Sequence, residues 1–174
     1  MKKNNDKRKI NKNLNKELAK TWNTEYPDSL WIYGDISKLE FRSEEFDEII
    51  IVHALEHLSM EKGNDALREA VRVLKHGGFL EVEVPNLTTA CELFLKAHIT
   101  FEWDNTPWFR IMGLLYGTTG SDGEGQFHLC GYSKEYLIYR MKEHKLINIT
   151  EIPVGFGHGR PEPQFDFRLR GYKL

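Results

Sequence analysis

Histidine side chains are the residues of this sequence whose type and spacing best suit acid–base chemistry. His53 follows a run of apolar residues, His57 comes four residues later, and His128 follows a glycine-rich segment. A neutral imidazole can take a proton from a hydroxyl or an amine, because histidine titrates near neutral pH. The alternative is that His53 ends a strand and His57 packs against a helix. The candidate catalytic residues are therefore His53, His57 and His128.

The same histidines raise the question of a metal site. His53 and His57 form a His-x-x-x-His pair with Glu56 directly before the second histidine, and His128 lies two residues before Cys130. The helical zinc motif of metalloproteases has its glutamate directly after the first histidine, and a structural zinc site has paired ligands. Neither pattern is present, so we predict no metal.

A second group of residues could bind a cofactor. Asp35 and Ile36 follow a short apolar run, residues 30–33, and His53 and Ala54 end the next apolar run. Ligands of an open α/β sheet bind at the carboxyl ends of its strands, where a carboxylate can accept hydrogen bonds from an exocyclic amine. The alternative is that the Gly-Asp pair forms an ordinary turn. We predict cofactor-binding roles for Asp35, Ile36, His53 and Ala54, the last two mainly through backbone contacts.

The elements that carry these residues follow from the apolar pattern. Phe46 and the run 49–52 predict a strand covered on both faces, because its apolar residues do not alternate with polar ones. An apolar stripe at helical spacing predicts an amphipathic helix over 60–75. Gly77 and Gly78 are expected to end this helix, because glycine accepts the left-handed backbone of a helix C-cap.

The second half of the chain alternates strands and helices. The strand over 80–84 alternates apolar residues with Glu81 and Glu83, which predicts one solvent-facing side. Strands over 147–153 and 165–173 are consecutive, which predicts an antiparallel hairpin at the edge of the sheet. Helices are predicted over 88–96, 107–115 and 133–145. This order favours an α/β architecture with right-handed crossovers.

A resemblance to a known family is carried by two segments, GDISKLEFRSEEFDEIIIVHALEHL and ALREAVRVLKHGGFLEVEVPN. Their order and spacing resemble the middle of small class I S-adenosylmethionine-dependent methyltransferases of the methyltransferase-11 type, except that His76 replaces a proline. The resemblance implies a three-layer Rossmann-like fold, with a mostly parallel sheet and a C-terminal antiparallel hairpin. It implies S-adenosyl-L-methionine as cofactor, with Asp35 at the adenine amino group and His128 near the site. The implied activity is methyl transfer to a small-molecule or surface nucleophile.

The glycine-rich opening of that family is missing, since the first glycine of this chain is Gly34. In the family this turn forms the floor of the cofactor site. The resemblance therefore implies a domain without its first two strands, in which residues 30–33 either pair beside the buried strand or leave an unpaired edge. A second copy or a partner chain could complete such a sheet. The alternative function is a non-catalytic or truncated methyltransferase-like binding module.

Length, composition and charge limit the domain organisation and the remaining classes of protein. The length of 174 residues suits a single domain, which we predict over residues 26–174. Residues 1–25 form a basic, Lys/Asn-rich arm with a short predicted helix. Residues 1–20 carry eight basic and two acidic side chains, so the rest of the chain is acidic, which argues against a broad nucleic-acid-binding face. No run of residues is long and apolar enough for a membrane span, and the two cysteines indicate no disulfide framework. We expect a soluble, cytoplasmic protein.

Overall fold

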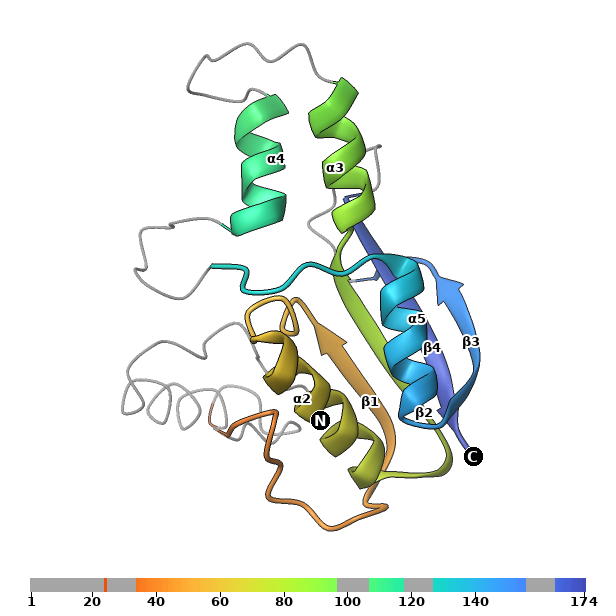
Figure 1. Cartoon of the computed structure of the whole chain (residues 1–174). Helices are drawn as coiled ribbons and strands as arrows, with labels where there is room; N and C mark the ends of the chain where they lie inside the picture. The colour runs from red at the N-terminus through yellow and green to blue at the C-terminus, as the bar shows by residue number, and fades with distance from the viewer. Residues whose placement is uncertain (1–23, 25–33, 97–106, 118–126, 156–164) are drawn as a thin grey trace.

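The computed structural model describes residues 24, 34–96, 107–117, 127–155 and 165–174 (Figure 1). The predicted strand over 30–33, nearly all of the basic arm and most of the glycine-rich segment lie outside these described residues. Among the described residues, no helix is long and apolar enough to cross a bilayer.

In the part of the chain that the structure describes, four strands form one mixed sheet in the order β1-β2-β4-β3. Its strands are β1 (Phe46–Val52), β2 (Leu74–Pro85), β3 (Leu146–Ile152) and β4 (Asp166–Lys173). β1 and β2 are parallel, whereas β4 is antiparallel to both β2 and β3. The α/β class and the C-terminal antiparallel hairpin are confirmed. Within the described residues, however, the sheet is mixed rather than mostly parallel.

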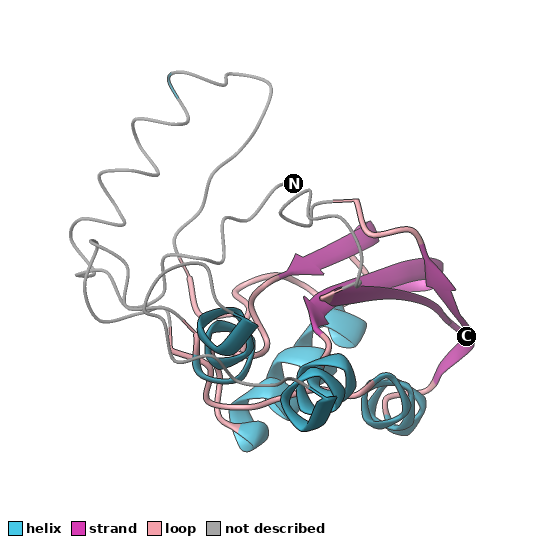
Figure 2. Cartoon of the chain, turned by 90° about the horizontal axis from the view of Figure 1, so that it is seen from above, coloured by secondary structure: helices cyan, strands magenta, loops and turns pink. Residues whose placement is uncertain are grey.

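The helices α2 (Met60–Val73) and α5 (Lys134–Glu143) cover one face of this sheet (Figures 1 and 2). Each begins at a serine: Ser59 accepts a hydrogen bond from the Lys62 amide, and Ser133 accepts one from the Tyr136 amide. Such caps satisfy amide groups that have no partner within the helix. The described helices lie on this one face, so the described part of the fold has two layers.

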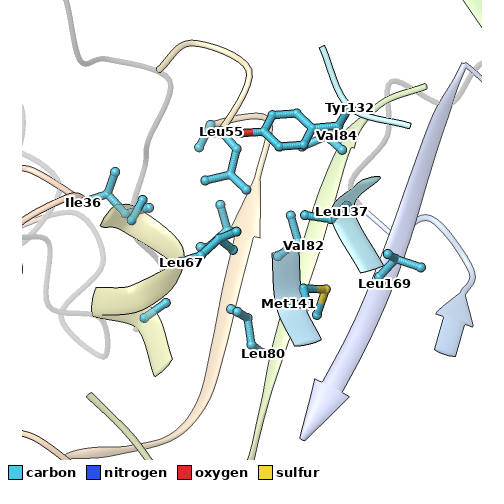
Figure 3. Close-up of a cluster of buried hydrophobic side chains, with 14 of the residues drawn as sticks. Ile36, Leu55, Leu67, Leu80, Val82, Val84, Tyr132, Leu137, Met141 and Leu169 are labelled. Carbon is cyan, nitrogen blue, oxygen red and sulfur yellow. The ribbon is translucent and has the colours of Figure 1, made fainter. Parts of the chain in front are cut away.

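The core fills the space between the sheet and these helices (Figure 3). Leu80 and Val82 of β2 face Leu67 of α2 and Met141 of α5, and all four side chains are at most 1% exposed. Alternation along β2 therefore directs its leucine and valines to the helical layer. After the carboxyl end of β2 the chain continues into α3 (Leu87–Lys96) and then α4 (Pro107–Tyr116), and these two helices pack against each other.

The end of α2 differs from the prediction. The helix ends at Val73, and Leu74 is already extended with ψ 137°. Gly77, at φ +76°, and Gly78 lie inside β2, where the pairing with β1 shifts register. A Cβ atom on Gly78 would lie 2.6 Å from the carbonyl oxygen of Asp47. The glycines thus permit a close approach of two strands rather than a helix end.

The exposure of two strands also differs from the prediction. Glu81 and Glu83 are 2% and 0% exposed, so the side of β2 that was expected to face solvent is buried. The reason is that Arg170 and Arg168 of β4 stand opposite them in the pairing register. Conversely, β1 is not covered on both faces, because Ile50 is 38% exposed and β1 is an edge strand of the described sheet.

Candidate functional site

His53 follows the last residue of β1 and has a strained backbone. Its φ is +44°, a region that bulky side chains seldom adopt. Its amide donates to the carbonyl of Glu83 at 3.0 Å, which continues the β1–β2 ladder by one bond. Such strain costs about 1–3 kcal/mol and is concentrated at functional sites in proteins. Positive φ also occurs at Glu44, Lys145 and Asn148, so the candidate site at the carboxyl ends of β1 and β2 depends on the side chains around His53.

Three carboxylates surround the His53 ring. Nδ1 lies 3.3 Å from an oxygen of Glu56, while Nε2 lies 3.7 Å from Glu83 and 3.9 Å from Asp166. Burial alone lowers the pKa of His53, but the interactions with Glu56 and Glu83, and then the charge of Asp166, raise this pKa to about 10. The ring is then protonated at neutral pH and has no lone pair for base catalysis.

The charged face of the sheet continues from Glu83 into β4. Arg168 pairs with Glu81 and lies 3.8 Å from Glu83, and Arg170 donates to Glu81 from Nε at 2.7 Å. The Arg170 guanidinium also lies 4.5 Å from the centre of the Phe79 ring. Buried carboxylates are costly unless they are paired, and this network pairs them. One side of β2 is thus apolar core, and the other is a network of compensated charges.

Beside this network, Glu56, His57 and His128 form a second cluster. One ligand-type atom from each lies within 4.8 Å of the other two. The rings of His57 and His128 pack edge to face at 5.1 Å between their centres, and His57 Nε2 lies 3.7 Å from a Glu56 oxygen. The backbone reinforces the cluster, because the Leu129 and Cys130 amides donate to the Glu56 carbonyl.

Both imidazoles of this cluster are oriented by backbone carbonyls. His57 Nδ1 is 2.9 Å from the carbonyl oxygen of Phe127, and His128 Nδ1 is 2.8 Å from that of Leu114. A carbonyl oxygen can only accept, so each Nδ1 carries the hydrogen and each neutral ring keeps its lone pair on Nε2. Burial lowers the pKa of His128, which favours the neutral ring at physiological pH.

The structure thus brings the three predicted catalytic histidines into two linked clusters that share Glu56. Sequence reasoning did not single out Glu56 as a functional residue. The available signal was its position between Leu55 and His57, where a carboxylate directly follows two apolar residues, Ala54 and Leu55; its side chain is 2% exposed. A buried carboxylate between two histidines is a site candidate in its own right.

The predicted cofactor residues on the other segment lie in a tight turn. Asp35 Oδ1 accepts from the Ser37 amide at 2.9 Å and from its hydroxyl at 2.7 Å. Ile36 is 5% exposed and points toward Leu67 of α2 (Figure 3), while Ala54 is fully buried at the end of β1. Asp35 therefore lies in a turn, as the alternative interpretation of the Gly-Asp pair expects. The cofactor-binding roles of Asp35, Ile36, His53 and Ala54 stay predictions.

Comparison with known proteins was made by family, by curated sequence and by structure. The methyltransferase domain family matches residues 2–82, just under half of the chain and including residues before Gly34. No curated protein matches.

Three solved structures are similar to this chain. A SAM-dependent methyltransferase from Thermotoga maritima is 19% identical, with a TM-score of 0.51 over 83% of this chain and 64% of its own. The PH0226 protein from Pyrococcus horikoshii is 15% identical, with a TM-score of 0.62 over 95% and 69%. PigF, solved with SAH, is 13% identical, with a TM-score of 0.56 over 93% and 41%.

The chain thus spans less than two thirds of the length of the Thermotoga protein. At these identities the structural matches bear on the fold, and the family match adds a similarity to the methyltransferase domain over residues 2–82. The family resemblance that the two sequence segments predicted is confirmed. The chain has the class I S-adenosylmethionine-dependent methyltransferase fold.

Proposed function

We propose that this protein transfers a methyl group from S-adenosylmethionine to a nucleophile on a small molecule or an exposed surface group. The observation that carries the proposal is the histidine and carboxylate site at the carboxyl ends of β1 and β2, the edge where open α/β sheets bind their ligands. Holding donor and acceptor in line at this edge would supply most of the rate acceleration.

The described residues fit one end of the cofactor. Asp35 directs one carboxylate oxygen to Ser37, and a carboxylate offers about four acceptor positions. Asp35 can therefore also accept from the exocyclic amine of adenine without losing its turn. When bound, the cofactor supplies the electrophilic methyl group. The floor beneath its ribose would come from residues outside the described part of the chain.

The histidines would act on the acceptor side. His53, held as a cation by three carboxylates, would fix the electrostatics of the edge rather than remove a proton. His57 and His128 each present an Nε2 lone pair, which suits contact with a hydroxyl or an amine. All three keep their proposed catalytic assignment, with different tasks.

Binding of S-adenosylhomocysteine to the full chain tests the cofactor part directly. We expect saturable binding by titration calorimetry, weakened about tenfold in Asp35→Asn, which keeps a Ser37 acceptor but loses the charge; tenfold is about 1.4 kcal/mol. The matched control is Asp47→Asn, an exposed aspartate at the other end of β1. Absence of binding at millimolar ligand by the folded protein would refute methyl transfer by this chain alone.

A second candidate function is favoured by the exposed edge of β1. A shallow groove that is partly open to solvent runs along β1 and is lined mainly by apolar side chains, among them Ile36, Phe41, Phe46, Ile49 and Ile50. An exposed apolar edge strand is a template for pairing with another strand. The alternative is that a second copy of this chain covers β1, and that the assembled pair acts as a methyltransferase-like binding module.

Sedimentation equilibrium tests pairing through β1. A dimer that becomes monomeric in Ile50→Lys, with unchanged circular dichroism, would support pairing through β1. The control is Ile147→Lys on β3, the opposite edge of the described sheet. If the wild type is a monomer at all concentrations, pairing through β1 is excluded, and no second copy of the chain occupies the groove.

A further inference from the structure

We propose that Glu56, His57 and His128 bind a divalent transition-metal ion, of the Zn²⁺, Mn²⁺, Co²⁺ or Fe²⁺ class. The ligand atoms would be a carboxylate oxygen of Glu56 and the Nε2 atoms of the two histidines. This site goes beyond methyl transfer, although it shares two residues with the proposed acceptor side. With a metal bound, His57 and His128 are ligands rather than bases.

The geometry of the three side chains suits one ion. Their ligand atoms lie within 4.8 Å of one another. Metal–ligand bonds of about 2.0–2.2 Å place two ligand atoms of one ion at most about 4.4 Å apart. Small side-chain rotations are therefore enough to bring the three atoms into one coordination sphere.

The two imidazoles are already oriented as metal ligands usually are. A ligating histidine commonly donates its second ring N–H to a carbonyl or carboxylate, which fixes the tautomer and the ring plane. His57 has this contact to the Phe127 carbonyl and His128 has it to the Leu114 carbonyl. These carbonyls belong to residues 13 positions apart in the chain, so the orientation of the two rings is set by the fold and not by a local helical repeat.

An independent observation concerns the Glu56 carboxylate. The Glu56 side chain is 2% exposed. Within the described residues neither of its carboxylate oxygens has a hydrogen-bond partner of normal geometry. One of these oxygens forms an ion pair with His53 Nδ1 at 3.3 Å. A buried carboxylate normally accepts hydrogen bonds or coordinates a metal. A cation between Glu56 and the two Nε2 atoms would satisfy this oxygen pair.

The donor set decides the class of ion. Two imidazoles and one carboxylate suit first-row transition metals, with open positions left for water or an acceptor group. Mg²⁺ prefers six oxygen ligands and retains its waters, so a site with two nitrogen donors disfavours it. The same open positions would bind an oxygen- or nitrogen-bearing acceptor beside the transferred methyl group.

Metal binding is measured without cofactor or acceptor, so its failure and a failure of methyl transfer are separate results. The full chain is stripped with a chelator, exchanged into chelator-free buffer and titrated with Co²⁺ and Zn²⁺. We expect one equivalent of Co²⁺ with visible absorption bands, displaced by Zn²⁺, and a rise in melting temperature with either ion. Mg²⁺ at the same concentration should produce no rise.

Variants separate this site from adventitious binding. His57→Gln and His128→Gln should each weaken Zn²⁺ binding at least tenfold. The matched control, His76→Gln, removes an exposed histidine that also pairs with a glutamate, Glu44, and should bind normally. Circular dichroism confirms folding of each variant. If the folded wild type binds neither ion at millimolar concentration, or if both site variants bind as tightly as wild type, the proposal is wrong.

Discussion

Replacing Gly63 with alanine measures how tightly Tyr132 closes the core beside α2. Gly63 is a buried residue inside the helix, and a Cβ atom there would lie 2.6 Å from the Tyr132 hydroxyl oxygen. Tyr132 is 3% exposed and stacks on Tyr136 with 5.8 Å between ring centres, so the ring cannot swing away. A contact of this length must displace one of the two residues.

Two effects of opposite sign determine the result. Alanine is favoured over glycine inside a helix by about 1 kcal/mol, whereas overpacking a core costs about 1–3 kcal/mol. We therefore expect Gly63→Ala to lower the free energy of unfolding by about 1 kcal/mol. In a Tyr132→Phe background the hydroxyl is gone, and the next atom is the ring carbon Cζ at 3.9 Å, an ordinary contact. There the same substitution should raise the stability by about 1 kcal/mol.

Urea unfolding of the four proteins in this double-mutant cycle provides the measurement. The expected coupling between positions 63 and 132 is about 2 kcal/mol, well above the non-additivity of about 0.5 kcal/mol seen for independent sites. The predicted change of sign distinguishes packing from helix propensity, which would be the same in both backgrounds. Stabilisation of the wild type by Gly63→Ala, or equal effects in both backgrounds, would refute the packing argument.

Three further predictions concern α2 and the β1–β2 pair. The hydrogen bond from Arg72 lowers the pKa of Glu69, so Glu69→Gln should lower the free energy of unfolding by about 1 kcal/mol at pH 7. This stabilisation of the wild type is present above pH 4.5 and is lost as the pH falls through the depressed pKa. The unfolding free energies of the wild type and the variant, measured by urea titration, should therefore converge in acid. Gly78→Ala should cost about 3 kcal/mol of unfolding free energy, because its Cβ would meet the backbone oxygen of Asp47; a loss below 1 kcal/mol would contradict this close approach. Lys75→Met removes an exposed ion pair with Asp47 and should change the melting temperature by less than about 2 °C.

Local sequence patterns predicted the helices and strands better than they predicted which residues cover the faces of those elements. The apolar stripe of α2 and the serine cap of α5 could be read from neighbouring residues, because helix periodicity and capping are local properties. The burial of Glu81 and Glu83 could not, since the residues that neutralise them, Arg168 and Arg170, come about 85 residues later. Alternation along a strand predicts two different sides, but it does not say what covers the polar one.

The same holds for the candidate site: its local signals could be predicted from the sequence, whereas its contacts between distant segments could not. His53 and His57 were predicted from their place after an apolar run, which is a local signal. The relation of Glu56 to His128 depends on two segments about 70 residues apart meeting at the carboxyl ends of the strands. The tautomers of His57 and His128 depend on backbone carbonyls, for which a sequence carries no side-chain signal.

The charged side of β2 is weak evidence for stability. Replacing a whole buried charge network by apolar residues of similar size is often neutral or stabilising, whereas removing a single partner from such a network is strongly destabilising. His53 adds a strained backbone at the same edge. Both features cost free energy, and both lie near the carboxyl ends of β1 and β2. The paired charges reach the proposed site through Glu83, which lies 3.7 Å from His53 Nε2. An array of charges that is already paired is the kind of preorganised environment that we propose for this edge of the sheet.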